Sequence, residues 1–239
     1  MAIVTNTVVY LDGDVVLEAF FAFDDEITGR RPAVLINHTW CGRDEFVAEK
    51  AKKLAAMGYV GFAVDMYGKG VLGSSADENM KLMQPFMADR AMLQQRMKAA
   101  LAAVRLMPWV DDSKIAAIGF CFGGLCVLDL ARAGADIKGV VSFHGLLFPA
   151  ENLQGCAIKA KVLALHGWDD PMVPVDQVHA FEKEMTKVGA DWQLQSYGNT
   201  MHGFTNPLAN DPIFGAVYQP VSDARSWLSM QNFLTEIFV

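Results

Sequence analysis

The sequence predicts an α/β fold in which a mostly parallel, doubly wound sheet is flanked by helices. After a strand-rich start, short apolar runs typical of buried strands alternate with longer stretches of helical periodicity. This alternation is the pattern of parallel strands joined by crossover helices. With 239 residues and 52% hydrophobic composition, the chain can bury a large core. We therefore expect one domain covering residues 1–239.

The expected elements follow from these patterns in chain order. The first two strands, Thr5 to Tyr10 and Val15 to Phe23, turn at Asp12-Gly13-Asp14. A further turn is expected at Asp111-Asp112-Ser113, where acidic and hydroxyl side chains cluster. Six later strands are expected at Pro32 to Asn37, Tyr59 to Asp65, Lys114 to Ile118, Gly139 to Phe143, Val162 to His166 and Trp192 to Tyr197, with helices beginning near Asp44, Asp77, Phe122, Val175 and Val221.

Proline divides the long helical segment between Asp77 and Met107. Pro85 lacks the backbone N–H that a helix interior requires, so we expect it to break or kink the segment, and Pro108 to end the second helix. The connection from His144 to Lys161 is too short for a large helical lid. This predicts an open or shallow site for a small soluble substrate.

Charge and cysteine usage exclude several classes of function. A net charge of −7 and a pI near 5.2 argue against nucleic acid as a partner. The first basic residue is Arg30, and the longest uncharged apolar stretch, Ile115 to Leu128, is too short to span a bilayer. We therefore expect a cytoplasmic protein with no membrane partner. The four cysteines lack zinc-type spacing, so no metal or disulfide framework is expected.

The pentapeptide Gly119-Phe120-Cys121-Phe122-Gly123 lies between an expected strand and an expected helix. It fits the G-x-nucleophile-x-G pattern of a nucleophile elbow, with cysteine where serine is usual. Glycines avoid collisions in so tight a turn, and the helix N-terminus favours a thiolate over a thiol at Cys121. The pattern predicts an enzyme with Cys121 as nucleophile. The alternative is a glycine-rich packing turn around an inert buried cysteine.

Two later loops carry the other groups that such a nucleophile requires, a base and an acid that orients it. The strand ending at His166 leads into a loop with Asp169 and Asp170, and the strand ending at Tyr197 leads into a loop with His202. Nucleophile, acid and histidine in this chain order are typical of an α/β-hydrolase. The order favours catalysis over an inert packing turn.

Three motifs together resemble the dienelactone hydrolase family of α/β-hydrolases: Gly-Phe-Cys-Phe-Gly-Gly, Asp-Asp-Pro-Met-Val-Pro and Met-His-Gly-Phe. The resemblance runs from the Pro32 strand to the C-terminal helix. It implies the α/β-hydrolase fold, with Cys121 as nucleophile, His202 as base and Asp170 as the orienting acid, because the family's acid immediately precedes x-x-Val-Pro. Spacing and resemblance also imply an oxyanion hole made by the backbone N–H groups of Phe122 and Trp40.

The sequence departs from dienelactone hydrolase at three positions. The resemblance places a glutamate beside the resting cysteine and arginines on the substrate carboxylate, where this chain has Thr39, Lys69 and Asn206. Threonine cannot accept a thiol proton near neutral pH, and lysine lacks the bidentate geometry of arginine. These three residues are candidates for substrate binding. His38 and His144 follow strand ends and are candidates too, although a structural hydrogen-bonding role fits them equally well.

These patterns predict a hydrolase that cleaves an activated ester or lactone of a small soluble substrate. We expect a Cys-His-Asp triad and a thioester acyl-enzyme, as in a carboxymethylenebutenolidase, with no cofactor. Two alternatives stay open. One is a non-catalytic or redox-sensing protein with this fold, in which Cys121 is oxidised, and the other is a thioesterase or acyltransferase.

Overall fold

The computed structural model describes residues 2–153 and 155–239. The chain forms two compact units, Met1–Ile118 and Gly119–Val239, and the single domain expected from the sequence stays a prediction. The first unit contains a mixed sheet and the second unit contains parallel strands, each with helices on both sides. The predicted α/β class is therefore confirmed.

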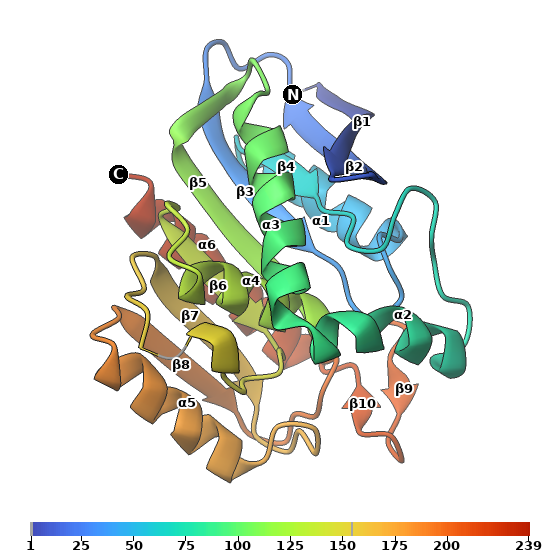
Figure 1. Cartoon of the computed structure of the whole chain (residues 1–239), viewed down its shortest axis with the longest axis vertical. Coiled ribbons are helices and arrows are strands. Elements are labelled where there is room, and N and C mark those ends of the chain that lie inside the picture. The colour runs from blue at the N-terminus through green and yellow to red at the C-terminus, as the bar shows by residue number, and fades with distance from the viewer. Residues whose placement is uncertain (1, 154) are drawn as a thin grey trace. The chain divides into compact units, whose positions relative to one another are not determined.

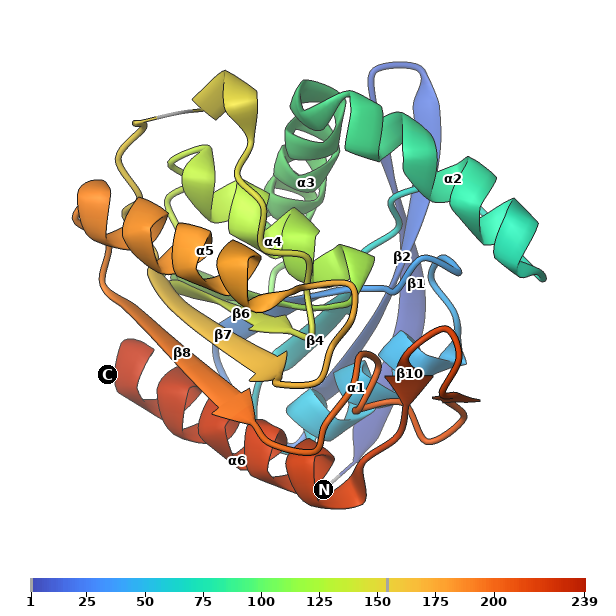
Figure 2. The same ribbon diagram turned by 90° about the horizontal axis from the view of Figure 1, so that it is seen from below.

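The first unit holds a sheet with the strand order β1-β2-β4-β3-β5. β1 and β2 form a long antiparallel hairpin, β2 also pairs antiparallel with β4, and β3 pairs parallel with β4. Helix α3 lies on one face of this sheet and α1 on the other (Figures 1 and 2). The elements are β1 (Ile3–Asp12), β2 (Val15–Asp24), β3 (Arg31–Asn37), α1 (Glu45–Ala55), β4 (Val60–Ala63), α2 (Ala76–Ala88), α3 (Arg90–Arg105) and β5 (Val110–Phe120), whose last two residues belong to the second unit.

Two predictions in this unit were wrong in detail. Asp111-Asp112-Ser113 does not form a turn but lies inside β5, where Asp111 accepts hydrogen bonds from the amide and hydroxyl of Ser113 without interrupting the strand. Pro85 lies within α2, and the helix breaks at Asp89. The reason is that Asp89 leaves the helical conformation and its carboxylate caps α3 by accepting from the Met92 amide at 3.0 Å.

The second unit is built on three parallel strands in the order β6-β7-β8. Figure 2 shows α4 and α5 on one face of these strands and α6 on the other. A β-carbon on Gly139 of β6 would lie 2.8 Å from the Phe233 ring, so α6 packs directly on the strand. The elements are α4 (Phe122–Arg132), β6 (Gly139–Phe143), the 3-10 turn η1 (Glu151–Leu153), β7 (Lys161–Gly167), α5 (Val175–Lys187), β8 (Trp192–Tyr197), β9 (Asn210–Asp211), β10 (Ala216–Val217) and α6 (Pro220–Ile237).

A buried arginine fixes the end of α4. The Arg132 guanidinium contacts Asp129 at 3.2 Å and Glu184 of α5 at 2.7 Å. It also donates to the carbonyl oxygens of Leu147 and Phe148. Because a buried charge is stable only when it is paired and hydrogen-bonded, these contacts hold α4, α5 and the loop after β6 in one arrangement.

The connection between β6 and β7 contains only η1 in its described part. Of the helices in residues 2–153 and 155–239, none has both the length and the apolar character needed to cross a membrane.

Candidate active site

The turn between β5 and α4 holds Cys121 in a strained conformation. Its φ of 56° and ψ of −117° lie where side chains are rarely found. A β-carbon on Gly119 would lie 2.0 Å from the Gly123 carbonyl oxygen. One on Gly124 would lie 2.6 Å from the Cα of Gly145. Glycine is therefore required on both sides of the turn, and the partly exposed Cys121 is held at the N-terminus of α4.

A carboxylate and an imidazole from two later loops meet in the same unit. Nδ1 of His202 lies 2.8 Å from Oδ2 of Asp170, and both residues are only 3% exposed. Oδ1 of Asp170 accepts from the Met172 amide at 2.8 Å, so the carboxylate is fixed through both oxygens. Asp169 is exposed, and its amide donates to the Thr200 carbonyl. Asp170 is thus the neighbouring aspartate that contacts His202.

A small hairpin formed by β9 and β10 holds the loop that carries His202 through backbone hydrogen bonds. The His202 amide donates to the Gly215 carbonyl at 3.0 Å, and the Val217 amide donates to the His202 carbonyl at 3.0 Å. A β-carbon on Gly167, at the end of β7, would lie 2.5 Å from the Thr200 carbonyl oxygen, so this loop also touches the acid strand directly. Sequence patterns do not predict this hairpin, because two-residue strands show no alternation.

The electrostatic surroundings favour a charged His202. Burial by itself lowers the pKa of its imidazole, but the negative charge of Cys121 and the hydrogen bond to Asp170 outweigh burial and raise the pKa to about 10. Nε2 is buried and, apart from its interaction with Cys121, has no hydrogen-bond partner among the described residues. Since Asp170 occupies Nδ1, Nε2 is the ring atom through which His202 can exchange a proton with Cys121 or a substrate.

Two groups beside this pair escape prediction as site residues. His166, at the end of β7, is buried, and burial lowers its pKa even though the charge of Asp170 opposes the change. Thr205 is fully buried, with its hydroxyl 2.8 Å from Nε2 of His144. His166 lies at the end of the strand that leads into the Asp170 loop, and this position in the sequence could have marked it as a site residue. Nothing in the sequence around Thr205 distinguishes it from an ordinary loop residue.

Two of the five substrate-binding candidates lie in the second unit. His144 is buried, and each ring nitrogen lies within hydrogen-bond distance of a protein group, the Cys121 amide or the Thr205 hydroxyl. These contacts favour a structural role for His144. Asn206 is half-buried, and its Oδ1 accepts from the Leu208 amide at 3.0 Å. Its Nδ2 is therefore the atom it could offer to a substrate.

His38 and Thr39 lie in the first unit, directly after β3. His38 is fully buried, with Nε2 accepting from the Met66 amide at 3.2 Å and Nδ1 bonded to the Thr39 carbonyl. Burial lowers the pKa of His38 to about 4, so the ring is neutral. Thr39 accepts from the Cys41 amide at 3.4 Å through its hydroxyl. The contacts of His38 favour a structural role, and substrate binding by Thr39 stays a prediction.

Trp40 and Lys69 also belong to the first unit. The Trp40 carbonyl accepts from the Tyr67 hydroxyl at 3.0 Å, which fixes the turn after β3. Lys69 forms an ion pair with Glu18 at 3.0 Å, and Arg43 contacts the same carboxylate at 3.1 Å. Lys69 thus has an acidic partner of its own. The Trp40 amide as oxyanion donor and Lys69 as carboxylate ligand remain predictions from the sequence.

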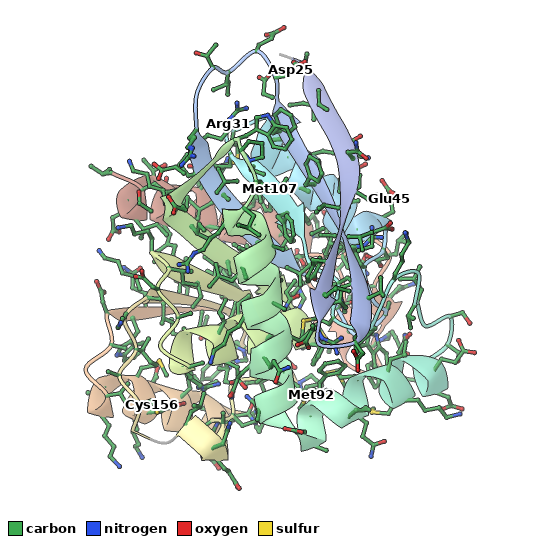
Figure 3. The ribbon with its side chains drawn as sticks, turned by 45° about the horizontal axis from the view of Figure 1, so that its top comes forward. Asp25, Arg31, Glu45, Met92, Met107 and Cys156 are labelled. Carbon is green, nitrogen blue, oxygen red and sulfur yellow. The ribbon has the colours of Figure 1, made fainter. Side chains whose placement is uncertain are left out.

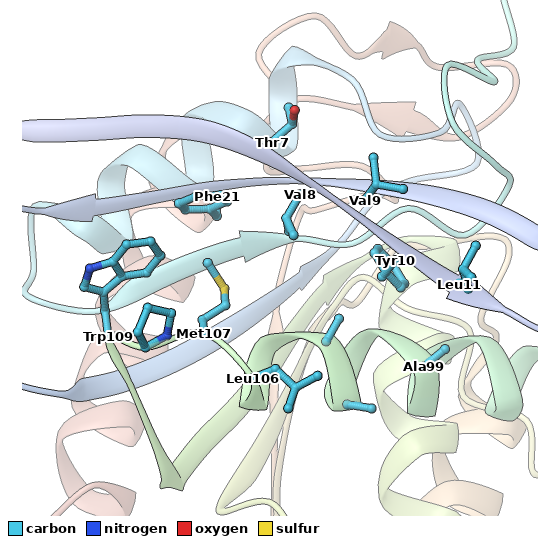
Figure 4. A pocket seen from close by; sticks show the side chains of 13 residues that line it. Thr7, Val8, Val9, Tyr10, Leu11, Phe21, Ala99, Leu106, Met107 and Trp109 are labelled. Carbon is cyan, nitrogen blue, oxygen red and sulfur yellow. The ribbon is translucent and has the colours of Figure 1, made fainter.

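Two cavities differ sharply in chemical character. One of about 360 Å³ adjoins the His202 loop and is lined by Asp169, Met201 and Tyr218, among others. The other, of about 650 Å³, lies in the first unit between β1, β2 and α3 (Figure 4). Apolar side chains such as Met107 and Trp109 dominate its lining, which includes no cysteine, histidine or carboxylate. It therefore lacks the groups that a hydrolytic site needs.

The remaining cysteines lie in different surroundings. Cys126 is buried within α4, whereas Cys156 is exposed on the loop between η1 and β7 (Figure 3). Cys41, after β3, is partly exposed, and its sulfur accepts from Nδ2 of Asn79 at 3.5 Å.

Comparison with known proteins gives consistent matches along almost the entire chain. The model of the dienelactone hydrolase family matches residues 17–238. A crystal structure described as a dienelactone hydrolase-like promiscuous phosphotriesterase, P91, from metagenomic libraries is 38% identical, and each chain covers 100% of the other with a TM-score of 0.95. This likeness confirms the predicted α/β-hydrolase fold.

Two curated relatives extend these matches. A Caenorhabditis elegans protein, K02A2.1, described as uncharacterized, is 40% identical over 149 residues, covering 61% of this chain and 94% of its own. A Bradyrhizobium protein described as a probable 2-oxo-3-(5-oxofuran-2-ylidene)propanoate lactonase is 26% identical over 211 residues, covering 84% of this chain and 82% of its own.

Proposed function

Because this chain belongs to the dienelactone hydrolase family, we propose that it hydrolyses activated esters or lactones of small substrates through Cys121, His202 and Asp170. The observation that carries the proposal is the 2.8 Å contact between His202 and Asp170, combined with the effect of the Cys121 charge on the His202 pKa. A nucleophile, a base and an acid that fixes the tautomer of the base are the minimum for covalent acyl transfer.

The first half of the proposed reaction acylates the cysteine. The Cys121 thiolate attacks the carbonyl carbon, and the carbonyl electrons move onto oxygen. The amide of Phe122 at the start of α4 is proposed to stabilise this oxyanion, with the Trp40 amide as second donor on sequence grounds. When the intermediate collapses, the carbon–oxygen bond of the leaving group breaks and the His202 imidazolium gives up its proton to that oxygen. A thioester on Cys121 results.

The second half releases the acid product. Neutral His202 removes a proton from water as the water oxygen attacks the thioester carbonyl. The tetrahedral intermediate then expels the Cys121 thiolate, which restores the thiolate beside an imidazolium. The Asp170 carboxylate holds Nδ1–H of the ring throughout, so that Nε2 carries out both proton transfers. The proposed steps use the three side chains, the backbone amides at the oxyanion and water.

Leaving-group chemistry limits the proposed substrate class. Thiolate is a good leaving group, so the intermediate from an unactivated amide would expel sulfur and return to substrate. Enol esters, lactones and aryl esters release a weaker base and proceed forward. Dienelactone itself is not proposed, because Lys69 is paired with Glu18 and Asn206 carries no charge. The lactonase relative supports a lactone.

A second candidate activity is the hydrolysis of activated phosphotriesters. It is favoured by the 38% identity to a protein described as a promiscuous phosphotriesterase. The same nucleophile would attack phosphorus instead of carbon, and an aryloxide leaving group would take the proton from His202. A panel of substrates should therefore include a p-nitrophenyl phosphotriester beside p-nitrophenyl acetate and small lactones.

Steady-state kinetics on four proteins test the proposal. We expect Cys121→Ala and His202→Ala to lose nearly all ester and lactone turnover, whereas Cys156→Ala, which removes an exposed thiol, keeps wild-type activity. Turnover that is unaffected by loss of Cys121 would refute the proposed site. Peroxide oxidation of Cys121 without any hydrolysis would favour the redox sensor, and transfer of the acyl group to an added alcohol or thiol in preference to water would favour an acyltransferase.

A further inference from the structure

His144 occupies an unusual position directly after β6. Its φ is 39°. Within residues 2–153 and 155–239, His144 is one of three non-glycine residues with a positive φ. The residue is 1% exposed, and its amide donates to the Leu165 carbonyl of β7 at 2.8 Å. A buried side chain with strained backbone persists only where its surroundings enforce it, and such strain is concentrated at functional sites.

The two ring nitrogens of His144 connect the nucleophile to the loop of the base. Nδ1 lies 3.2 Å from the Cys121 amide nitrogen, which also donates to the Phe143 carbonyl at 3.0 Å. Nε2 lies 2.8 Å from the Thr205 hydroxyl oxygen, three residues beyond His202. Because a backbone N–H can only donate, Nδ1 must be the acceptor. The proton of the neutral ring is then on Nε2, which donates to Thr205.

Packing fixes the same ring against the base. The His144 and His202 rings lie edge-on with centroids 5.1 Å apart, and His144 meets Phe204 in the same way at 5.0 Å. Through its hydrogen bonds and its ring packing, His144 thus contacts the nucleophile elbow, the base His202 and the loop that carries this base. With both nitrogens engaged and the ring buried, it has no atom to offer a substrate.

We propose that His144 is a positioning residue: its Nε2–H tautomer ties the Cys121 backbone to the His202 loop and so sets the separation between the sulfur and Nε2 of His202. The inference rests on the proposed function and names a residue that acts through the triad without touching substrate. Acyl transfer depends steeply on this separation, since misplacement of reacting groups by about 1 Å can lower a rate by roughly 100-fold.

Two substitutions remove the connection from opposite ends. His144→Asn keeps an acceptor near Nδ1 and tolerates positive φ, but has no donor that reaches Thr205. Thr205→Val removes the acceptor with little change in shape. Thr205→Ser keeps the hydroxyl and is the conservative control. Thr235→Val, on the exposed face of α6, is a matched change far from any proposed role.

We expect kcat to fall in the variants that lose the hydrogen bond between His144 and Thr205 and to be kept in those that retain it. For p-nitrophenyl acetate, we expect His144→Asn and Thr205→Val each to lower kcat by roughly 10–100-fold with little change in KM, and the double variant to lose little more than either one. Thr205→Ser should restore most of kcat, and Thr235→Val should match wild type. Each kcat is divided by the fraction of Cys121 that iodoacetamide alkylates, so that misfolded protein does not lower the value.

Each outcome decides the question. If properly folded Thr205→Val and His144→Asn turn over at the wild-type kcat while Cys121→Ala is inactive, the positioning role is overturned and the proposed function stands. If kcat per reactive Cys121 is unchanged and only the melting temperature falls, His144 is merely structural. If Cys121→Ala remains active, both proposals fail. Should His144→Asn not fold, Thr205→Val alone carries the test.

Discussion

Loss of the Cys121 sulfur should lower the pKa of His202. In the native protein the charge of Cys121 makes the largest contribution to raising this pKa, which reaches about 10 although burial opposes the rise. An opposite charge within about 4–6 Å shifts a pKa by roughly 1–3 units. In Cys121→Ala we therefore expect the His202 pKa to fall to between about 7 and 9. This corresponds to roughly 1–4 kcal/mol of coupling between the two side chains.

The sign of the change defines the pH range in which the two proteins differ. Below the lowered pKa both proteins carry an imidazolium at His202, and above about pH 10 neither does. Between these limits wild type keeps the proton and Cys121→Ala releases it. The difference should thus be largest in mildly alkaline solution, where the remaining contacts to Asp170 act alone against burial.

NMR titration of ring-labelled histidine measures this pKa directly. The chain has five histidines, and the spectrum of His202→Gln identifies the signal of interest. Cys126→Ala, which removes a buried thiol from α4, is the matched control and should leave the His202 pKa unchanged. An identical His202 pKa in wild type and Cys121→Ala would refute the reasoning, because it would mean that the cysteine does not interact with the ring.

Three further predictions concern the acid, the elbow and the buried arginine. Asp170→Asn should lower kcat by roughly 10³-fold with little effect on KM, since the amide presents a donor to Nδ1 and favours the wrong tautomer; a pH–rate profile checks this. Gly119→Ala should lower the free energy of unfolding by about 1–3 kcal/mol in urea, because its β-carbon would lie 2.0 Å from the Gly123 carbonyl oxygen, whereas Gly198→Ala, with open space around it, should not. Arg132→Leu should lower the free energy of unfolding by about 3–5 kcal/mol, because the buried carboxylate of Asp129 loses the guanidinium that lies 3.2 Å away; a stability equal to wild type would contradict this.

Much of the fold could be predicted because local pattern and tertiary structure agree. Gly139–Phe143 and Trp192–Tyr197 have the predicted bounds, and α4 and α5 begin at the predicted residues. Both strands are short runs between clear breakers, and Gly139–Phe143 is a continuous run that is buried at every position, which is typical of a buried strand. Predictions failed where a single side chain determines where a helix ends, as at α2, which ends at Asp89 and not at Pro85.

In the candidate site, too, residues that belong to local motifs could be predicted, whereas contacts between distant parts of the chain could not. The motifs predict Cys121, Asp170 and His202 as a triad because each belongs to a characteristic turn or loop, and the structure brings His202 and Asp170 within 2.8 Å of each other. Contacts that depend on three-dimensional structure carry no such signal: the engagement of Lys69 with Glu18, the burial of His38 and the bond from His144 to Thr205. Sequence therefore offers candidates for the chemistry, whereas the contacts that hold these candidates in place become visible only in the structure.

Direct detection of the acyl-enzyme tests the central claim. His202→Ala should acylate slowly with p-nitrophenyl acetate and fail to hydrolyse the product, because the base that activates water is gone. Intact-mass measurement should show one added acetyl group per chain, and peptide mapping should place it on Cys121, with no adduct in Cys121→Ala. An acetyl group on another residue, or steady turnover by Cys121→Ala, would contradict the account.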